Sequence, residues 1–211
     1  MGKIYMTACM KGGCAKTVTT YNLAYSLKEL GKKVLCVGFI SSSMMLSAVD
    51  AKLRLEMGAE KMLSEILEPL RDKYDVIIID TAPALGALNI NALVVADEVI
   101  ITVNPQLLAM MGLQNFLKIV KKIRSRVNDR LSVAGILLTM CDARTNLCKV
   151  IIEQVRDTFE GQIRIFESRI PNTVKVGESV YYSEPLIEYA PESNATKAYK
   201  NLAKELINYE G

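Results

Sequence analysis

The stretch KGGCAKTVTT, residues 11–20, contains the residue types with which a protein loop holds phosphate. Two neighbouring glycines are followed by Cys14 and Ala15, and then by Lys16 and Thr17. In a phosphate-binding loop, successive backbone N–H groups and the positive end of the following helix attract the phosphates. A lysine reaches the outer phosphates, and a Ser or Thr hydroxyl binds Mg²⁺. The spacing predicts these last two roles for Lys16 and Thr17.

The loop departs from the general pattern G-x-x-x-x-G-K-[ST] at both glycine positions, where this chain has Met10 and Ala15. The motif alone therefore leaves two interpretations open. Either the loop binds a nucleotide, or it is a tight strand-to-helix turn that happens to be rich in glycine.

A carboxylate that could complete a magnesium site ends the run YDVIIID, residues 74–80. The apolar residues of this run predict a strand that is buried on both faces and that ends at Asp80. An aspartate in that position helps to hold the metal of a nucleotide site, usually through water. We expect Thr17 and Asp80 to be the metal-binding pair.

Short apolar runs alternate with segments of helical period along the chain. Strands are expected at residues 4–8, 33–39, 74–80, 99–103, 133–140 and 163–166, and helices at 17–30, 46–70 with a break at Gly58, 108–127, 151–159 and 196–208. This alternation is typical of an α/β fold with a mostly parallel sheet that is covered by helices on both faces. Ligands bind at the carboxyl ends of such strands, where residues 9–17, Asp80 with Thr81, and residues 142–146 fall.

Composition narrows the class of protein. The 211 residues indicate a single domain, 1–211, and the net charge of +3 permits nucleic-acid binding without arguing for it. No apolar run approaches the roughly 20 residues of a membrane helix, and no signal-peptide pattern opens the chain. The five cysteines lack the spacing of a metal site, and there is no histidine. We expect free, mostly buried thiols in a reducing cytoplasm.

Several long stretches resemble the ParA family of DNA-partition ATPases. They are KGGCAKTVTTYNLAYSLKELGKKVLCV, YDVIIIDTAPALGALNINALVVADEVIITVNPQLLAMMGL, GILLTMCDARTNL and PLIEYAPESNATKAYKNLAKELI, and together they cover nearly the whole chain. The resemblance implies a P-loop NTPase fold with the deviant Walker A motif K-G-G-x-G-K-[ST], and ATP with Mg²⁺ as cofactors. It also implies an ATP-sandwiched dimer in which Lys11, as a catalytic residue, reaches the partner's nucleotide.

The resemblance assigns further residues to binding. The nucleotide would lie against Lys11, Gly12, Gly13, Cys14, Ala15, Lys16, Thr17, Val18 and Pro171, the last in a segment that faces the adenine in relatives. Non-specific DNA binding falls on Arg144 and Lys175, which the sequence alone would read as solvated or helix-capping charges. The basic run KKIRSR, residues 121–126, is expected to be a solvated helix end, with phosphate contact as the lesser alternative.

This chain departs from the family pattern at positions that serve nucleotide binding and hydrolysis in the family. Ala15 replaces the second loop glycine, and Val18 replaces a threonine. After its second strand the family continues into D-x-D-P-Q, whose acids serve Mg²⁺ and the attacking water. Gly38 and Ile40 stand where those acids would be, and FISSSMMLSAVDAKL instead resembles a segment that follows a later family strand. A few dozen residues therefore look excised near Gly38.

The resemblance and the departures together predict a partition protein with a damaged nucleotide site. It would bind ATP weakly or not at all, would not hydrolyse it, and would bind non-specific DNA and a ParB-like partner protein. It would form a homodimer, or a heterodimer with an intact paralogue, in the cytoplasm or on the nucleoid and not on a membrane. The alternative is an ATP-driven DNA-partition ATPase that tolerates the substitutions.

Overall fold

The computed structural model describes residues 1–9, 12–38, 50–53, 56, 58–82, 86–105, 109–142 and 144–208, without the side chains of 109–111. Its centre is a six-stranded sheet in which every pairing is parallel, with the order β2-β3-β1-β4-β5-β6. The strands are β1 (Lys3–Ala8), β2 (Val34–Gly38), β3 (Val76–Asp80), β4 (Glu98–Val103), β5 (Ser132–Cys141) and β6 (Ile165–Pro171). The predicted parallel sheet is confirmed.

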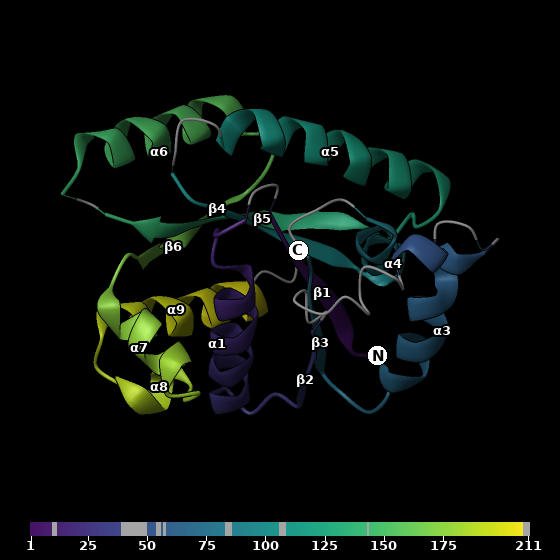
Figure 1. Ribbon diagram of the computed structural model, residues 1–211, viewed down its shortest axis with the longest axis horizontal. Coiled ribbons are helices and arrows are strands. Elements are labelled where there is room, and N and C mark those ends of the chain that lie inside the picture. Colours follow the sequence, from purple (N-terminus) through teal and green to yellow (C-terminus); the bar gives the residue numbers. More distant parts are fainter. Residues whose placement is uncertain are drawn as a thin grey trace.

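Helices cover both faces of the sheet (Figure 1). One layer contains α3 (Met62–Leu67), α4 (Ala87–Val95), α5 (Ala109–Arg126) and α6 (Asn146–Phe159), together with the short 3-10 turns η1 (Ala59–Lys61) and η2 (Glu68–Leu70). The opposite layer contains α1 (Lys16–Glu29), α7 (Val174–Tyr181), α8 (Leu186–Tyr189) and α9 (Asn194–Asn208). Among the described residues, no helix is both long and apolar enough to cross a membrane.

The two apolar cores explain why the central strands read as continuous hydrophobic runs. Ile77 and Ile79 face the core under α4, whereas Ile78 faces the core under α1 and α9, and all three are fully buried. A strand that is covered on both faces has no position at which a polar side chain can reach water. Asp80 is therefore an exception that calls for a reason other than packing.

The sequence prediction missed α4, α7 and α8 and ended β6 too early. The segment of α4, ALNINALVV, is apolar on all sides and shows no helical period, because it is buried almost throughout. Its two asparagines are buried and form hydrogen bonds with backbone groups. Asn91 Oδ1 accepts from Leu63 N at 3.1 Å, and Asn89 Nδ2 donates to Ala82 O at 3.0 Å. In β6, buried and exposed residues alternate, which is typical of an edge strand and hid its length.

Candidate nucleotide-binding site

The loop of residues 9–17 leaves the carboxyl end of β1, a central strand, and leads directly into α1. Gly13 has a φ of 78°, and Ala15, the N-cap residue of α1, has φ 56° and ψ 30°. Ala15 is thus in the left-handed conformation, which costs an L-residue about 1–2 kcal/mol. Its carbonyl accepts the N–H of Thr19 at 2.8 Å, so this backbone geometry starts the helix.

Among the described residues, no atom crowds the two glycines of the loop. A Cβ built on Gly12 or Gly13 would meet no atom of the described residues within 4 Å, and both glycines are exposed. Backbone that approaches a phosphate needs this freedom from side chains. The loop therefore keeps the room, and the two adjacent glycines, that a phosphate site requires.

Lys16, Thr17 and Asp80 come together beneath the loop, as the sequence predicted. Thr17 Oγ1 donates to Asp80 Oδ2 at 2.7 Å, and Lys16 and Asp80 are only 7% and 9% exposed. Burial raises the pKa of Asp80, while the Thr17 hydrogen bond and the Lys16 charge oppose the rise. Burial also lowers the pKa of Lys16, against the charge of Asp80. Two opposite charges are thus held close to the carboxyl edge of the sheet with little access to water.

The second carboxylate oxygen of Asp80 fits a metal. Asp80 Oδ1 is buried and has no hydrogen-bond partner among the described residues. A buried polar atom without a partner is costly, and it is normally found where a ligand or ion completes the site. Carboxylate and hydroxyl oxygens are donors that Mg²⁺ prefers. Asp80 and Thr17 could therefore hold Mg²⁺, next to phosphates bound by the loop and Lys16.

Burial of Asp80 gives a pH-dependent cost to folding that Asp80→Asn should remove. In the absence of Mg²⁺, the folded chain keeps the Asp80 proton to a higher pH than the unfolded chain, so stability falls as pH rises above the ordinary value of 3.8. Urea unfolding at a series of pH values should therefore show that the stability of Asp80→Asn relative to wild type increases as pH rises above 3.8. A difference that shrinks or stays constant would contradict this.

Asp142→Asn is the control, because its stability relative to wild type should change with pH in the opposite direction. Arg144 lowers the pKa of this exposed carboxyl to about 2, so its ionised form is favoured by folding. Stability from Asp142 is present above its unfolded pKa and is lost as pH falls towards its folded one. Asp142→Asn should therefore lose stability relative to wild type as pH rises, by a small amount because the pair is exposed.

Buried threonines at the strand ends support the base of the loop; Thr81 was expected at this edge of the sheet, whereas Thr7 and Thr20 were not predicted. Thr7 Oγ1 lies 2.6 Å from Thr20 Oγ1 and donates to Ile79 O at 3.2 Å, and Thr81 Oγ1 donates to Thr7 O at 2.7 Å. These bonds join β1, α1 and β3. A threonine at the last positions of an otherwise apolar strand is the signal that could have revealed them.

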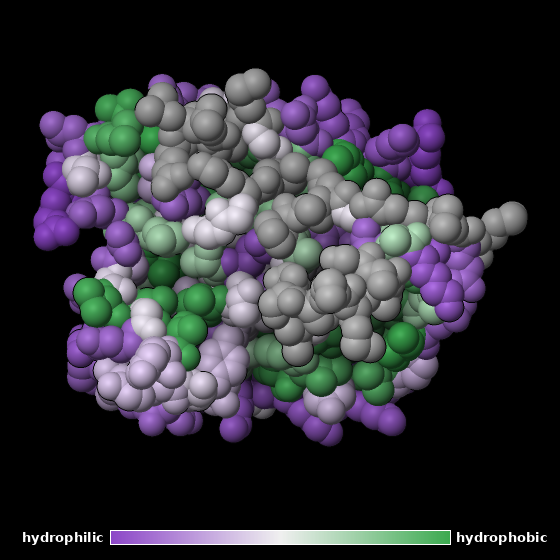
Figure 2. Space-filling model, in the orientation of Figure 1, coloured by the Kyte–Doolittle hydropathy of each residue, from purple (hydrophilic) through white to green (hydrophobic). Residues whose placement is uncertain are grey.

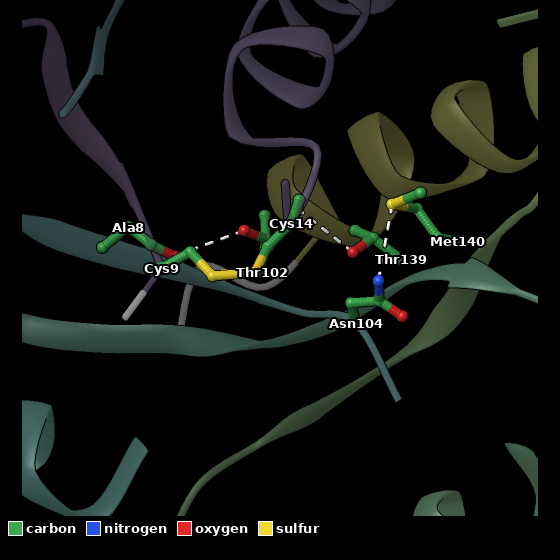
Figure 3. Close-up of a disulfide and its surroundings, with 7 residues drawn as sticks. All are labelled: Ala8, Cys9, Cys14, Thr102, Asn104, Thr139 and Met140. Atoms are coloured by element: carbon green, nitrogen blue, oxygen red, sulfur yellow. Dashed lines mark hydrogen bonds between the residues drawn. A yellow bond between two sulfur atoms is a disulfide. The ribbon is translucent and has the colours of Figure 1, made fainter. Parts of the chain in front are cut away.

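Cys9 and Cys14 are joined by a disulfide, so the expectation of free thiols is wrong for this pair (Figure 3). Their Cα atoms are 6.4 Å apart, within the range that a disulfide spans. The expectation failed because the spacing was compared only with metal motifs, whereas these two cysteines lie close enough in space to be bonded. Cys36, Cys141 and Cys148 are free, and the last two are buried as expected.

The predicted departures lie at or beside the site. Gly38, at the end of β2, is the register partner of Asp80 and is exposed. Val18 is half-buried and packs against the core under α1, where it offers no hydroxyl. Lys11 and Ile40 lie outside the described residues.

Pro171, the residue predicted to face the adenine, is the last residue of β6 and is paired with Cys141 of β5. The N–H of Asn172 donates to Cys141 O at 3.0 Å, which fixes the chain where it leaves the sheet. Pro171 thus lies at the carboxyl edge of the sheet, two strands beyond β4, which neighbours β1.

The two predicted DNA-binding residues are exposed but paired. Arg144 donates from Nε and Nη2 to the two carboxylate oxygens of Asp142, each at 2.9 Å, and its side chain is 89% exposed. Lys175 Nζ lies 2.9 Å from Glu178 Oε2 and 5.6 Å from the centre of the Tyr189 ring, and Glu178 raises its pKa. The charge of each basic group is therefore partly offset by a neighbouring carboxylate.

Apolar side chains are exposed around Lys175. Val174, Val180 and Tyr181 of α7 are 74%, 56% and 82% exposed. Figure 2 shows apolar and weakly polar residues together on this part of the surface, over α7 and α8. This surface was not predicted from the sequence because α7 was not.

A family model described as an AAA domain matches residues 37–133. In the solved structures, cobyrinic acid a,c-diamide synthase of Mycobacterium smegmatis, crystallised with ADP and magnesium, is 25% identical with a TM-score of 0.82, over 99% of this chain and 95% of that one. MinD of Pyrococcus horikoshii with Mg-ADP is 22% identical with a TM-score of 0.75, over 98% and 96%, and shows the fold alone.

Curated relatives extend over the full length. The sporulation initiation inhibitor protein Soj of Bacillus subtilis is 32% identical over 251 aligned positions, which include 98% of each chain. The chromosome-partitioning ATPase Soj of Treponema pallidum is 31% identical, over 100% of this chain and 99% of its own. Because this chain has 211 residues, at least 40 positions of the first alignment lack a residue here. With such identity along almost the whole of both sequences, the chain belongs to the ParA family of DNA-partition ATPases.

Proposed function

We propose that this chain, as a single domain, is a ParA-type partition protein with a weakened nucleotide site. It binds Mg-ATP weakly or not at all, does not hydrolyse it, and acts through non-specific DNA and a ParB-like partner protein. The observation that carries the proposal is the left-handed conformation of Ala15 at the start of α1. Glycine adopts that conformation freely, whereas alanine adopts it at a cost and places a methyl group beside the phosphate path.

The rest of the loop supports retained, weak binding. In the proposal, backbone N–H groups of Gly12, Gly13, Cys14 and the residues up to Val18 surround the phosphates, and Pro171 borders the base. Lys16 supplies positive charge, and Thr17 with Asp80 holds Mg²⁺. When bound, Mg²⁺ offsets the negative charge of the outer phosphates. The hydrogen bond between Thr17 and Asp80 keeps the two oxygen donors adjacent without a ligand.

Dimerisation follows the family pattern in this proposal. Lys11 would reach the nucleotide of a second subunit, which is either a copy of this chain or an intact paralogue. A subunit that holds ATP poorly and lacks the acids at Gly38 and Ile40 would then tune or inhibit an active partner. Size measurements with and without Mg-ATP, for this chain alone and mixed with the paralogue, separate the two arrangements.

DNA binding through Arg144 and Lys175 should be independent of sequence and steeply dependent on salt. Each phosphate contact releases counterions, so removing both side chains should reduce the slope of log affinity against log salt by about 1 per residue. Arg144→Ala with Lys175→Ala, measured by anisotropy on two unrelated DNA sequences, tests this. The matched control is Arg124→Ala with Arg126→Ala, which removes the same charge from the last turn of α5.

The control should leave the slope unchanged while the double variant flattens it equally on both DNA sequences. An unchanged slope in the double variant, with a flattened slope in the control, would move the DNA surface to the end of α5.

Replacing the acidic partners of the two basic residues offers a gain-of-function check. Asp142→Asn and Glu178→Gln free the two basic groups from their ion pairs, so both should strengthen binding at low salt.

A second function, an ATP-driven partition ATPase, is favoured by one observation. The Thr17–Asp80 hydrogen bond, and a buried Asp80 Oδ1 that has no partner among the described residues, preserve a donor set that a disused site would have no reason to keep. Steady-state phosphate release distinguishes this function from the first, because only the second requires turnover.

A further inference from the structure

We propose that Cys9 and Cys14 form a redox-sensitive pair whose oxidation locks the phosphate loop and lowers its affinity for Mg-ATP. This inference rests on the proposed nucleotide site, since it concerns the control of that site. Cys9 is the first residue after β1, and Cys14 directly precedes the N-cap of α1. The bond between them closes residues 9–14 into a covalent ring that contains both loop glycines.

Both ends of the ring are fixed to neighbouring strands (Figure 3). Thr102 Oγ1 of β4 donates to Ala8 O at 3.4 Å, and Thr139 Oγ1 of β5 donates to Cys14 O at 3.2 Å. Cys9 and Cys14 are 8% and 5% exposed, so the disulfide lies inside the base of the loop rather than on its surface. The disulfide thus adds a covalent tie between two points that are each also hydrogen-bonded to the sheet.

The ring controls how far the loop can adapt to a phosphate. With alanine at the left-handed position, a phosphate enters only if the loop moves slightly away from the methyl group of Ala15. A closed disulfide opposes that movement because it ties Cys14, the residue before Ala15, covalently to Cys9 at the end of β1. In the reduced pair this covalent tie is absent, and a hydrogen bond such as that from Thr139 to Cys14 O is a weaker restraint. The reduced chain should therefore be the form that binds nucleotide.

The chemistry is ordinary thiol–disulfide exchange with a small-molecule disulfide such as oxidised glutathione. The thiolate of one cysteine attacks the small disulfide, forms a mixed disulfide and releases one small thiol. The thiolate of the second cysteine then attacks the protein sulfur of the mixed disulfide and releases the second small thiol. The protein pair loses two electrons and two protons in total, and the small disulfide is reduced to two thiols.

The test compares Mg-ATP affinity of the full chain after equilibration in reduced or oxidised glutathione, using a fluorescent ATP analogue. Peptide mapping without reductant shows whether Cys9 and Cys14 are linked in each sample. We expect the bridge in the oxidised sample only, and an affinity about tenfold lower there than in the reduced sample. Cys9→Ser should bind like the reduced chain in both buffers. Cys36→Ser, which removes an exposed free thiol, should keep the full redox dependence.

The outcomes separate this inference from the proposed function. If the bridge forms and the two affinities are equal, or if no bridge forms in oxidised glutathione, the inference is wrong and the nucleotide site stands. If the same redox dependence persists in Cys9→Ser, the effect belongs to other cysteines and the inference is again wrong. If neither redox form of the wild type nor of Ala15→Gly binds the analogue, the nucleotide site itself is refuted, and its redox control with it.

Discussion

Phosphate release by this chain, with Mg-ATP, DNA and a ParB-like partner present, will stay at least about a hundredfold below that of the Treponema pallidum chromosome-partitioning ATPase under the same conditions. The family places the acids for Mg²⁺ and for the attacking water after the second strand. Here β2 ends at Gly38, whose register partner is Asp80, and neither Gly38 nor Ile40 can supply a carboxylate. Loss of one group that stabilises a transition state commonly costs about 10²–10³ in rate.

Lys16→Ala provides the baseline for that measurement. The variant removes the buried cation that would face the outer phosphates, so any residual phosphate release that it shares with wild type comes from contamination or background. We expect the two traces to coincide. A wild-type turnover equal to that of the relative, and abolished in Lys16→Ala, would establish the alternative function instead.

Ala15→Gly should strengthen Mg-ATP binding at least about tenfold without restoring hydrolysis. Ala15 is left-handed without a ligand, so its conformational cost falls on folding, and glycine should help binding by removing the methyl group that alanine places beside the phosphate path. One tenfold step in affinity corresponds to about 1.4 kcal/mol. Competition against a fluorescent ATP analogue measures the ratio.

Ser183→Gly is the matched control, because Ser183 has the same φ of 56° as Ala15 but lies between α7 and α8. Both glycine variants should gain stability, since both remove a left-handed non-glycine residue. Only Ala15→Gly should gain nucleotide affinity. An equal gain in both variants would mean that general stabilisation, and not the loop, controls binding.

The sheet could be predicted because burial on both faces leaves a simple signal. VIIID of β3 and its neighbours must be apolar wherever helices cover them, and α1 ends at Glu29, one residue before its expected end at residue 30. The convergence of Lys16, Thr17 and Asp80 was also predictable, because parallel strands bring their carboxyl ends to one edge. The 2.7 Å hydrogen bond from Thr17 to Asp80 shows that the two residues expected to bind the metal are adjacent.

The disulfide could not be predicted because it depends on the path of the loop and not on cysteine spacing. Residues five apart can lie far from each other in a strand or close together in a turn, and here the Cα atoms are 6.4 Å apart. The threonine hydrogen bonds from β4 and β5 escaped for a related reason: each depends on a neighbouring strand that is distant in sequence. Local pattern carries no information about such partners.

Helices α4 and α7 were not predicted from the sequence, for opposite reasons. Inside α4, apolar residues on every side erase the helical period, and its asparagines bond to backbone within the protein. The sequence of α7 has an amphipathic pattern, but two of its apolar side chains, Val174 and Tyr181, are exposed. From the sequence, the segment was therefore taken for a loop beside Lys175, the predicted DNA-binding residue.

Calorimetric titration of the reduced wild-type chain with Mg-ATP, in parallel with Ala15→Gly, tests the weakened nucleotide site most directly. The proposal predicts weak or undetectable heat for wild type and a clear binding isotherm, at least about tenfold tighter, for the glycine variant. Micromolar binding by wild type with no gain in Ala15→Gly would show that the alanine is harmless and that the nucleotide site is intact.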